Sequence, residues 1–319
     1  MGQPSILDFL SQQGGFGLLV LLAIQFGAQP LLAKCFIEPG TPTTSLVLGS
    51  ELTKIAGCLC MLHVQGELRS AFADWTLRGA LVAAGLPSLT YLVQNICTQL
   101  AYQHLDALAF NVLNQSKMVS TAFFSLVISG RRQSRMQCVA LGMVMLGGSL
   151  VSISASGADA TAEERTSSSF GLLCIMLASV LSGFGSGITE WVLHGKSRNC
   201  YLFSIEMAVF GVLVLLGSLL LNLTGDSGKL REEGLFSKWG ALTIVPVVTQ
   251  GWGGIIVGLI TKVAGGVKKG FAVISGLVLT CLLKWFILGE VLSPLALAGV
   301  PLVAASVYLH ASHPISKSR

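Results

Sequence analysis

The chain has 319 residues, of which 52% are hydrophobic and only 11% are charged, and its mean hydropathy is +0.74. An ordinary soluble domain carries about 25% charged residues, so this composition excludes a typical water-soluble protein. The formal net charge is +5, and the sequence contains no Gly-rich phosphate loop ending in Lys-Ser or Lys-Thr, which argues against an ATP-driven pump.

Apolar runs of about 20 residues recur along the chain, and each could cross a hydrocarbon core roughly 30 Å thick as a helix. The predicted spans cover residues 15–34, 43–63, 79–103, 107–129, 136–155, 169–192, 202–223, 238–262, 268–288 and 292–312. The segment before the first span lacks the basic residues of a cleavable signal peptide, so we expect that span to remain. The sequence therefore predicts an all-α polytopic membrane protein with ten transmembrane helices.

Positive residues concentrate in alternate loops, which sets the predicted orientation because Lys and Arg are retained on the cytosolic side. The basic loops contain Arg69, Arg78, Arg131, Arg132, Arg135, Lys196 and Arg198, and the tail 313–319 contains Lys317 and Arg319. Both termini are therefore predicted to be cytosolic. The small, polar linker 156–168 is predicted to be luminal, and it divides one membrane domain into halves 1–155 and 169–312.

Polar residues inside the spans are candidate functional residues, because a charge at bilayer depth costs at least a few kcal/mol. In the second span, Glu51 and Lys54 have the i, i+3 spacing of an internal ion pair, for which a structural role is expected. In the third span, Tyr91, Gln94 and Asn95 lie on a stripe about 100° wide that offers hydrogen bonds and an aromatic face. Such a stripe suits a nucleoside.

Three further spans carry candidates. In the fourth, Phe110, Asn114 and Lys117 lie within about 60° of one another on a helix. This polar face should line a helix interface or a cavity. In the sixth, Ser182 lies among glycines, where close helix packing is the competing explanation. In the seventh, Glu206 either reads a base N–H or is merely interfacial.

Lys269 begins the ninth span, next to Lys268, for which snorkelling to the interface is the simpler explanation. The fourth and ninth spans are equivalent in the two halves, and the weak similarity of their following turns indicates inverted repeats of five spans. Such repeats bring equivalent helices together at the bilayer midplane, so Lys117 and Lys269 are predicted to face one cavity. Two converging ammonium groups without a facing carboxylate pair imply an anionic substrate, for which a phosphate is the natural choice.

At these segments the chain resembles the nucleotide-sugar transporters of the drug/metabolite transporter superfamily, in the branch that carries CMP-sialic acid, UDP-galactose and UDP-N-acetylglucosamine. The resemblance rests on TYLVQN and LAY in the third span, FNVLNQSKM in the fourth, SGF-x-SG in the sixth and KKGFA in the ninth. It implies exchange of a cytosolic nucleotide sugar for a luminal nucleoside monophosphate, without chemistry. It also implies that Lys117 and Lys269 bind phosphate, with Tyr91, Gln94, Asn95, Phe110 and Ser182 around base, ribose and sugar.

Departures from the family pattern bear on the base. Relatives commonly place Tyr where this chain has Phe110 and Asn114, and the CMP-sialic acid carriers show Asn and Tyr where it has Ser204 and Ala208. Losing these partners of a cytosine favours a UDP-sugar over a CMP-sugar. Two alternatives remain: a carrier of sugar phosphates or small metabolites with the same fold, and a non-transporting scaffold for a glycosyltransferase.

No catalytic constellation or metal-ligand set is present in the sequence, so we expect no enzyme activity, cofactor, metal or nucleic-acid partner. The family resemblance implies the Golgi membrane, with the endoplasmic reticulum membrane as the alternative. The small-residue face LGMVMLGGS in the fifth span is compatible with a homodimer.

Overall fold

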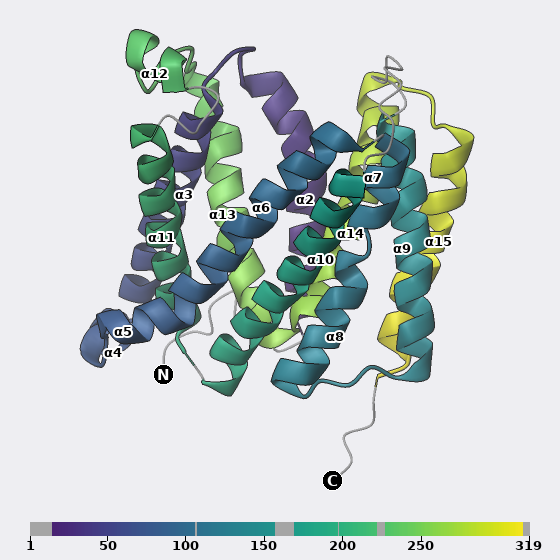
Figure 1. Cartoon of the computed structure of the whole chain (residues 1–319), viewed down its shortest axis with the longest axis horizontal. Helices are drawn as coiled ribbons and strands as arrows, with labels where there is room; N and C mark the ends of the chain where they lie inside the picture. Colours follow the sequence, from purple (N-terminus) through teal and green to yellow (C-terminus); the bar gives the residue numbers. More distant parts are fainter. Residues whose placement is uncertain (1–14, 106, 157–168, 197, 222–226, 315–319) are drawn as a thin grey trace.

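The computed structural model describes residues 15–105, 107–156, 169–196, 198–221 and 227–314 (Figure 1). Within these ranges the chain consists of helices joined by short connections and contains no strand. Nine helical stretches in the described ranges are long and apolar enough to cross a membrane. The predicted all-α, multi-spanning class is therefore confirmed, whereas the count of ten spans and their repeat symmetry stay predictions.

The helices follow the predicted spans closely. Those of the first predicted half are α2 (Phe16–Phe36), α3 (Thr43–Val64), α4 (Leu68–Ala73), α5 (Leu77–Ala80), η1 (Leu81–Gly85), α6 (Leu86–His104), α7 (Ala107–Asn114), α8 (Lys117–Ser129) and α9 (Arg135–Ser156). Those of the second are α10 (Ser169–Glu190), η2 (Trp191–Gly195), α11 (Cys200–Leu220), α12 (Ser227–Glu233), η3 (Ala241–Thr243), α13 (Ile244–Val263), α14 (Gly266–Leu288) and α15 (Pro294–Ser312). Most of the predicted linker 156–168 and of the tail 313–319 lies outside the described residues.

The predicted span 107–129 is two helices rather than one. α7 ends at Asn114, and α8 begins at Lys117. Between them the backbone N–H groups of Gln115 and Ser116 bond to carbonyls three residues back, at 3.2 and 3.0 Å. The Ser116 hydroxyl also donates to the Leu113 carbonyl at 2.6 Å. Such local bonds compete with the regular helical ladder, so the polar sequence Asn-Gln-Ser-Lys interrupts the helix.

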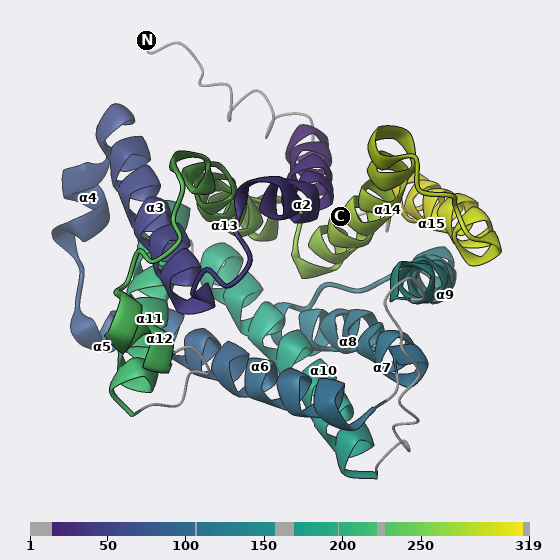
Figure 2. The same ribbon diagram turned by 90° about the horizontal axis from the view of Figure 1, so that it is seen from above.

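The halves 1–155 and 169–312 interlock, and their helices pack in a symmetric pattern (Figure 2). α2 packs on α14 as α10 packs on α8, and α6 packs on α10 as α13 packs on α2. α3 packs on α11, and α9 on α15. These six pairings are unchanged when α2, α3, α6, α8 and α9 are exchanged for α10, α11, α13, α14 and α15, whereas α3 packs on α13 far more extensively than α11 packs on α6. A two-fold relation between inverted halves produces such a pattern.

One face of the bundle, at the lower edge of Figure 1, gathers helix ends from both halves. There the start of α2 meets the end of α13, since a Cβ on Gly15 would lie 3.1 Å from the Val263 side chain. The loop after α8 meets the end of α15, where the Ser134 hydroxyl donates to the His313 carbonyl at 3.0 Å. We call this surface the lower face. Arg131, Arg132 and Lys196 of the predicted cytosolic loops lie there or adjoin it.

A cavity between the helices

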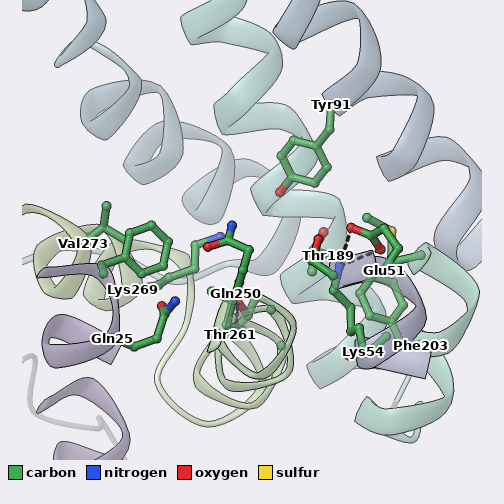
Figure 3. Close-up of a pocket in the computed structure, with 18 residues that line it drawn as sticks. Gln25, Glu51, Lys54, Tyr91, Thr189, Phe203, Gln250, Thr261, Lys269 and Val273 are labelled. Carbon is green, nitrogen blue, oxygen red and sulfur yellow. Dashed lines mark hydrogen bonds and ion pairs between the residues drawn. The ribbon is translucent and has the colours of Figure 1, made fainter. Parts of the chain in front are cut away.

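A cavity of about 410 Å³ lies between helices of both predicted halves. Its walls come from α2, α3 and α6 of the first half and from α10, α11, α13 and α14 of the second. Its polar and aromatic lining consists of Gln25, Phe26, Ser50, Glu51, Lys54, Tyr91, Thr189, Phe203, Ser204, Gln250, Thr261 and Lys269 (Figure 3). Small-molecule sites usually measure roughly 300–1,000 Å³, so the cavity has the size of a ligand site.

Lys269 brings a positive charge to one side of this cavity (Figure 3). It lies in the first turn of α14, and its backbone N–H bonds to the carbonyl of Gly265 at 3.2 Å. Gly265 has φ +86, and a Cβ there would lie 2.8 Å from Glu190 Oε1, so both backbone conformation and space require glycine. In the described chain the Lys269 ammonium makes no hydrogen bond or salt bridge.

An ion pair occupies another side of the cavity. Lys54 Nζ on α3 lies 2.8 Å from both carboxylate oxygens of Glu51. The Lys54 stem lies against Gly254 of α13, where a Cβ would come 3.3 Å from its Nζ. In Figure 3 this pair and Lys269 lie on opposite sides of the α13 ribbon. Because Glu51 neutralises Lys54, Lys269 supplies the net positive charge of the cavity.

Uncharged donors and acceptors fill the remaining wall. Gln25 on α2 donates from Nε2 to the Thr249 carbonyl at 3.2 Å, and its Oε1 is a buried acceptor with no partner in the described chain. The Ser204 hydroxyl on α11 donates to the Cys200 carbonyl at 2.9 Å. Tyr91 lies over Gly185 of α10, where a Cβ would be 3.2 Å from its ring. These groups can orient the polar parts of a ligand.

The structure brings only some of the predicted site residues to this cavity. Tyr91, Ser204 and Lys269 line it, together with the predicted pair Glu51 and Lys54. The other candidates are not among its lining residues: Gln94, Asn95, Phe110, Asn114, Lys117 and Ser182.

Four of these outer candidates lie on α6 and α7: Gln94, Asn95, Phe110 and Asn114. Gln94 Nε2 donates weakly to Asn95 Oδ1 at 3.5 Å, and Asn95 is exposed. Phe110 meets Tyr102 edge to face, with ring centroids 5.3 Å apart. The polar stripe of α6 is thus divided between the cavity, which Tyr91 reaches, and the surface beside α7.

Lys117 begins α8 and is partly buried. Its neighbour Met118 packs on Gly270 of α14, so Lys117 and Lys269 lie on packed helices. In the described residues the Lys117 ammonium, like that of Lys269, has no hydrogen bond or salt bridge. An unpaired charge within a span is costly, so this lysine calls for an anion that the protein itself does not supply.

Two further candidates lie away from the cavity. Glu206 on α11 pairs with the Arg198 guanidinium and accepts a hydrogen bond from Trp75 Nε1 at 3.0 Å, which occupies both of its oxygens. Lys268 is exposed and lines a separate groove on the lower face. The arrangement of Glu206 corresponds to the interfacial alternative.

Charged and polar groups around Glu190 connect helices at the lower face, and we call this group of residues the latch. The Glu190 carboxylate on α10 is fully buried, and its Oε1 lies 2.8 Å from Arg131 Nε in a charge contact. Its Oε2 accepts hydrogen bonds from the Ser125 hydroxyl at 3.0 Å and from the Gly266 N–H at 3.2 Å. His194 Nε2 lies 3.0 Å from Arg131 Nη2. The latch therefore joins α8 and its loop to α10 and α14, across the two predicted halves.

Gln25 and Gln250 line the cavity without having been predicted, and so does the glycine-rich face of α13. A Cβ on Gly253 would lie 2.5 Å from the Gln25 amide carbon, so this glycine makes room for the amide. The signal was present in the sequence, because Gln25 and Gln29 lie in an otherwise apolar run and GWGG follows Gln250 directly. Which helix faces meet across the cavity is a tertiary property that the spacing does not contain.

Comparisons with known proteins agree with this architecture. The family model described as nucleotide-sugar transporter matches residues 20–311. A UDP-N-acetylglucosamine transporter of Arabidopsis thaliana is 38% identical over 297 residues, covering 92% of this chain and 91% of that protein. The UDP-galactose translocator of Mus musculus is 27% identical over 274 residues, covering 84% and 70%.

A UDP-N-acetylglucosamine/UDP-N-acetylgalactosamine transporter of Caenorhabditis elegans is 26% identical over 290 residues, covering 86% of this chain and 85% of that one. One solved crystal structure shares the fold, with a TM-score of 0.64 over 94% of this chain and 96% of that chain, at 13% identity. The family match spans nearly the whole helical bundle that encloses the cavity. This chain therefore belongs to the nucleotide-sugar transporter family, and it is a transporter rather than an enzyme.

Proposed function

We propose that this protein exchanges a cytosolic UDP-sugar for luminal UMP by alternating access, with the substrate held in the cavity between the halves. The observation that carries the proposal is the ammonium group of Lys269, which enters a cavity of ligand size without an internal partner. An anion is the chemistry that this group lacks. The relatives are named as transporters of UDP-sugars, which favours a UDP-sugar here, and UDP-N-acetylglucosamine is the first candidate.

In this proposal the phosphates bind Lys269 and Lys117. Lys117 is not at the cavity wall in this structure, but α8 and α14 pack directly on each other. A small shift of α8 would turn its first residue toward the anion, whose charge would offset the cost of holding two ammonium groups in a low dielectric. Tyr91 and Ser204 then contact the nucleoside or the sugar. A state in which α6 and α7 close over the ligand would bring further candidates to it, namely Gln94, Asn95, Phe110, Asn114 and Ser182.

Alternating access requires two halves that rock about a fixed site, and the symmetric helix pairing supports this. We infer that the lower face is closed in the state described here, because the Glu190–Arg131 latch joins the two halves there. Opening of the lower face would break the latch. If the predicted orientation holds, this is the cytosolic gate, and the protein lies in the Golgi membrane, or in that of the endoplasmic reticulum, with both termini in the cytosol.

The proposal is tested in liposomes that contain the purified protein. Vesicles preloaded with UMP should take up external UDP-N-acetylglucosamine, whereas empty vesicles or vesicles preloaded with AMP should take up little. Lys269→Gln should abolish this uptake. Lys34→Gln should preserve it, because Lys34 is an exposed lysine at the other end of α2 and does not line the cavity.

Other results would redirect the assignment. Equal uptake into CMP-loaded and UMP-loaded vesicles would extend the substrates to CMP-sugars. Uptake of sugar phosphates without any response to nucleotides would identify a sugar-phosphate carrier. No uptake of either class by a stable, correctly folded preparation would leave the scaffold function.

A further inference from the structure

A second pocket, separate from the cavity between the helices, lies on the lower face at the side of the bundle. It has a volume of about 970 Å³ and is bounded by the first turns of α2, the first turns of α14 and the end of α15. In Figure 2 these three helices form one side of the bundle. We call it the α2–α15 groove.

The inner walls of the groove are apolar. Phe16 and Val20 of α2 line it and are exposed, Phe271 and Ala272 form its floor on α14, and Ala311 faces it from α15. From Phe16 to Ala23, the last α2 residue in the lining, the helix rises roughly 10 Å. The groove therefore extends from the lower face into the depth of a membrane leaflet.

The mouth of the groove is positively charged. Arg131, Arg132 and Lys268 line it, and Glu190 is the one carboxylate among its lining residues in the described chain. Glu190 is already paired with Arg131. Arg132 and Lys268 are exposed, and neither makes a hydrogen bond or salt bridge within the described ranges. The cationic side chains of Arg132 and Lys268 thus remain available at the mouth of the apolar α2–α15 groove.

We propose that the α2–α15 groove binds an anionic phospholipid, with its phosphate on Arg132 and Lys268 and the first part of an acyl chain along α2 and α15. Basic pockets between transmembrane helices bind anionic head groups in this way. The combination of a basic mouth with apolar walls favours a lipid over a free nucleotide, because a nucleotide has no hydrocarbon chain to contact the apolar walls. Arg131 belongs to both the groove mouth and the latch, so this lipid lies beside the group that closes the lower face.

The test is native mass spectrometry of the purified full-length protein with phosphatidylserine and phosphatidylcholine of identical chains. Wild type should retain phosphatidylserine in preference to phosphatidylcholine. Arg132→Gln and Lys268→Gln should each lower this retention about fivefold, the effect of one cationic side chain near an anionic membrane lipid. Arg135→Gln is the matched control, because Arg135 is exposed at the start of α9, three residues after Arg132, but does not line the groove.

The acyl chain is tested separately. Ala311→Phe should obstruct the groove and lower retention, whereas Ala304→Phe, on an exposed position of α15 outside the groove, should leave it unchanged. Equal retention of the two lipids, or an equal loss in Arg135→Gln, would overturn the proposal by showing that surface charge alone is measured. Loss through the charge variants with no effect of Ala311→Phe would instead identify a site for a free phosphate group. Each variant changes an exposed side chain, so folding should persist.

Discussion

Lys117 and Lys269 are partly buried, and their ammonium groups lack internal partners in the described chain. Lys54, by contrast, is neutralised by Glu51 within 2.8 Å. The presence or absence of an internal partner distinguishes two roles that a lysine can have within a membrane protein. An internally paired lysine can hold a structure, whereas a partly buried lysine without a partner is a candidate for binding an anion. The two unpaired lysines lie on helices that pack on each other, so one anion could satisfy both.

We expect Lys117→Gln and Lys269→Gln each to weaken UMP binding by about thirtyfold, because a hydrogen bond to a charged group contributes about 2 kcal/mol. Titration calorimetry of the detergent-purified variants measures this directly. The double variant should bind only slightly more weakly than either single variant, because residues that share one phosphate are energetically coupled. Strictly additive losses would mean that the lysines serve separate anions. Lys34→Gln provides the control for a general loss of positive charge.

The site was only partly predictable at this scale. Charged and aromatic residues in apolar spans stand out in a sequence, which is why Lys269, Tyr91 and the Glu51–Lys54 pair were found. Gln25 and Gln250 did not stand out, since an amide in a span is as often a helix-packing group. Gln94 and Asn95 share a stripe with Tyr91, but α6 crosses α10 in such a way that one end of the stripe reaches the cavity and the other faces outward.

Among the elements, α8 and α10 approach each other closely through the glycine-rich segment that begins at Ser182. Gly183 lies against the backbone of Ser120, where a Cβ would come 2.6 Å from the carbonyl oxygen. Gly187 lies against Phe124 in the same way, at 3.2 Å from its carbonyl oxygen. The structure therefore uses this segment for close helix packing, which sets the position of Lys117 relative to the cavity.

Gly183→Ala should destabilise the protein by about 1–3 kcal/mol, because an added methyl group against a backbone forces the helices apart. The measurement is the thermal unfolding midpoint in detergent. Gly142→Ala is the matched control, since Gly142 lies in α9 and nothing would lie within 4 Å of its Cβ. That variant should leave the midpoint unchanged or raise it slightly, because alanine has the higher helix propensity. Equal behaviour of the two variants would remove close packing as the reason for Gly183.

Helix bounds were predictable because hydropathy and helix length determine them. The predicted spans 43–63 and 136–155 correspond to Thr43–Val64 and Arg135–Ser156. The interruption between α7 and α8 was not predicted. Averaged hydropathy passes over it, whereas the break depends on hydrogen bonds of Ser116 to Leu113 and to Ser179 of α10. The second of these bonds exists only in the folded bundle.

For the whole molecule, the latch around Glu190 joins helices of the two predicted halves at the lower face. One carboxylate holds the Arg131 side chain, the Ser125 hydroxyl and the backbone N–H of Gly266, so that α8, α10 and the start of α14 move together. His194 supports Arg131, and its Nδ1 lies 2.8 Å from the Lys262 carbonyl at the end of α13. Because Lys269 follows Gly266 by one turn of helix, loosening the latch also loosens the element that carries the cavity charge.

Glu190→Gln keeps the shape of the side chain but removes its charge. It should therefore weaken the latch without creating a packing cavity. Hydrogen bonds to charged groups contribute about 1.5–3 kcal/mol, so the lower face should open roughly tenfold to a hundredfold more often. Hydrogen–deuterium exchange of the backbone amides in residues 264–270 should accelerate by that factor, because those amides exchange only when the start of α14 leaves α10. Glu51→Gln breaks an ion pair of the same chemistry on α3, away from the latch, and should leave exchange in 264–270 unchanged. Faster exchange in both variants would show that residues 264–270 respond to general destabilisation of the protein. Unchanged exchange in Glu190→Gln would show that helix packing, without the charge of this carboxylate, keeps the lower face closed.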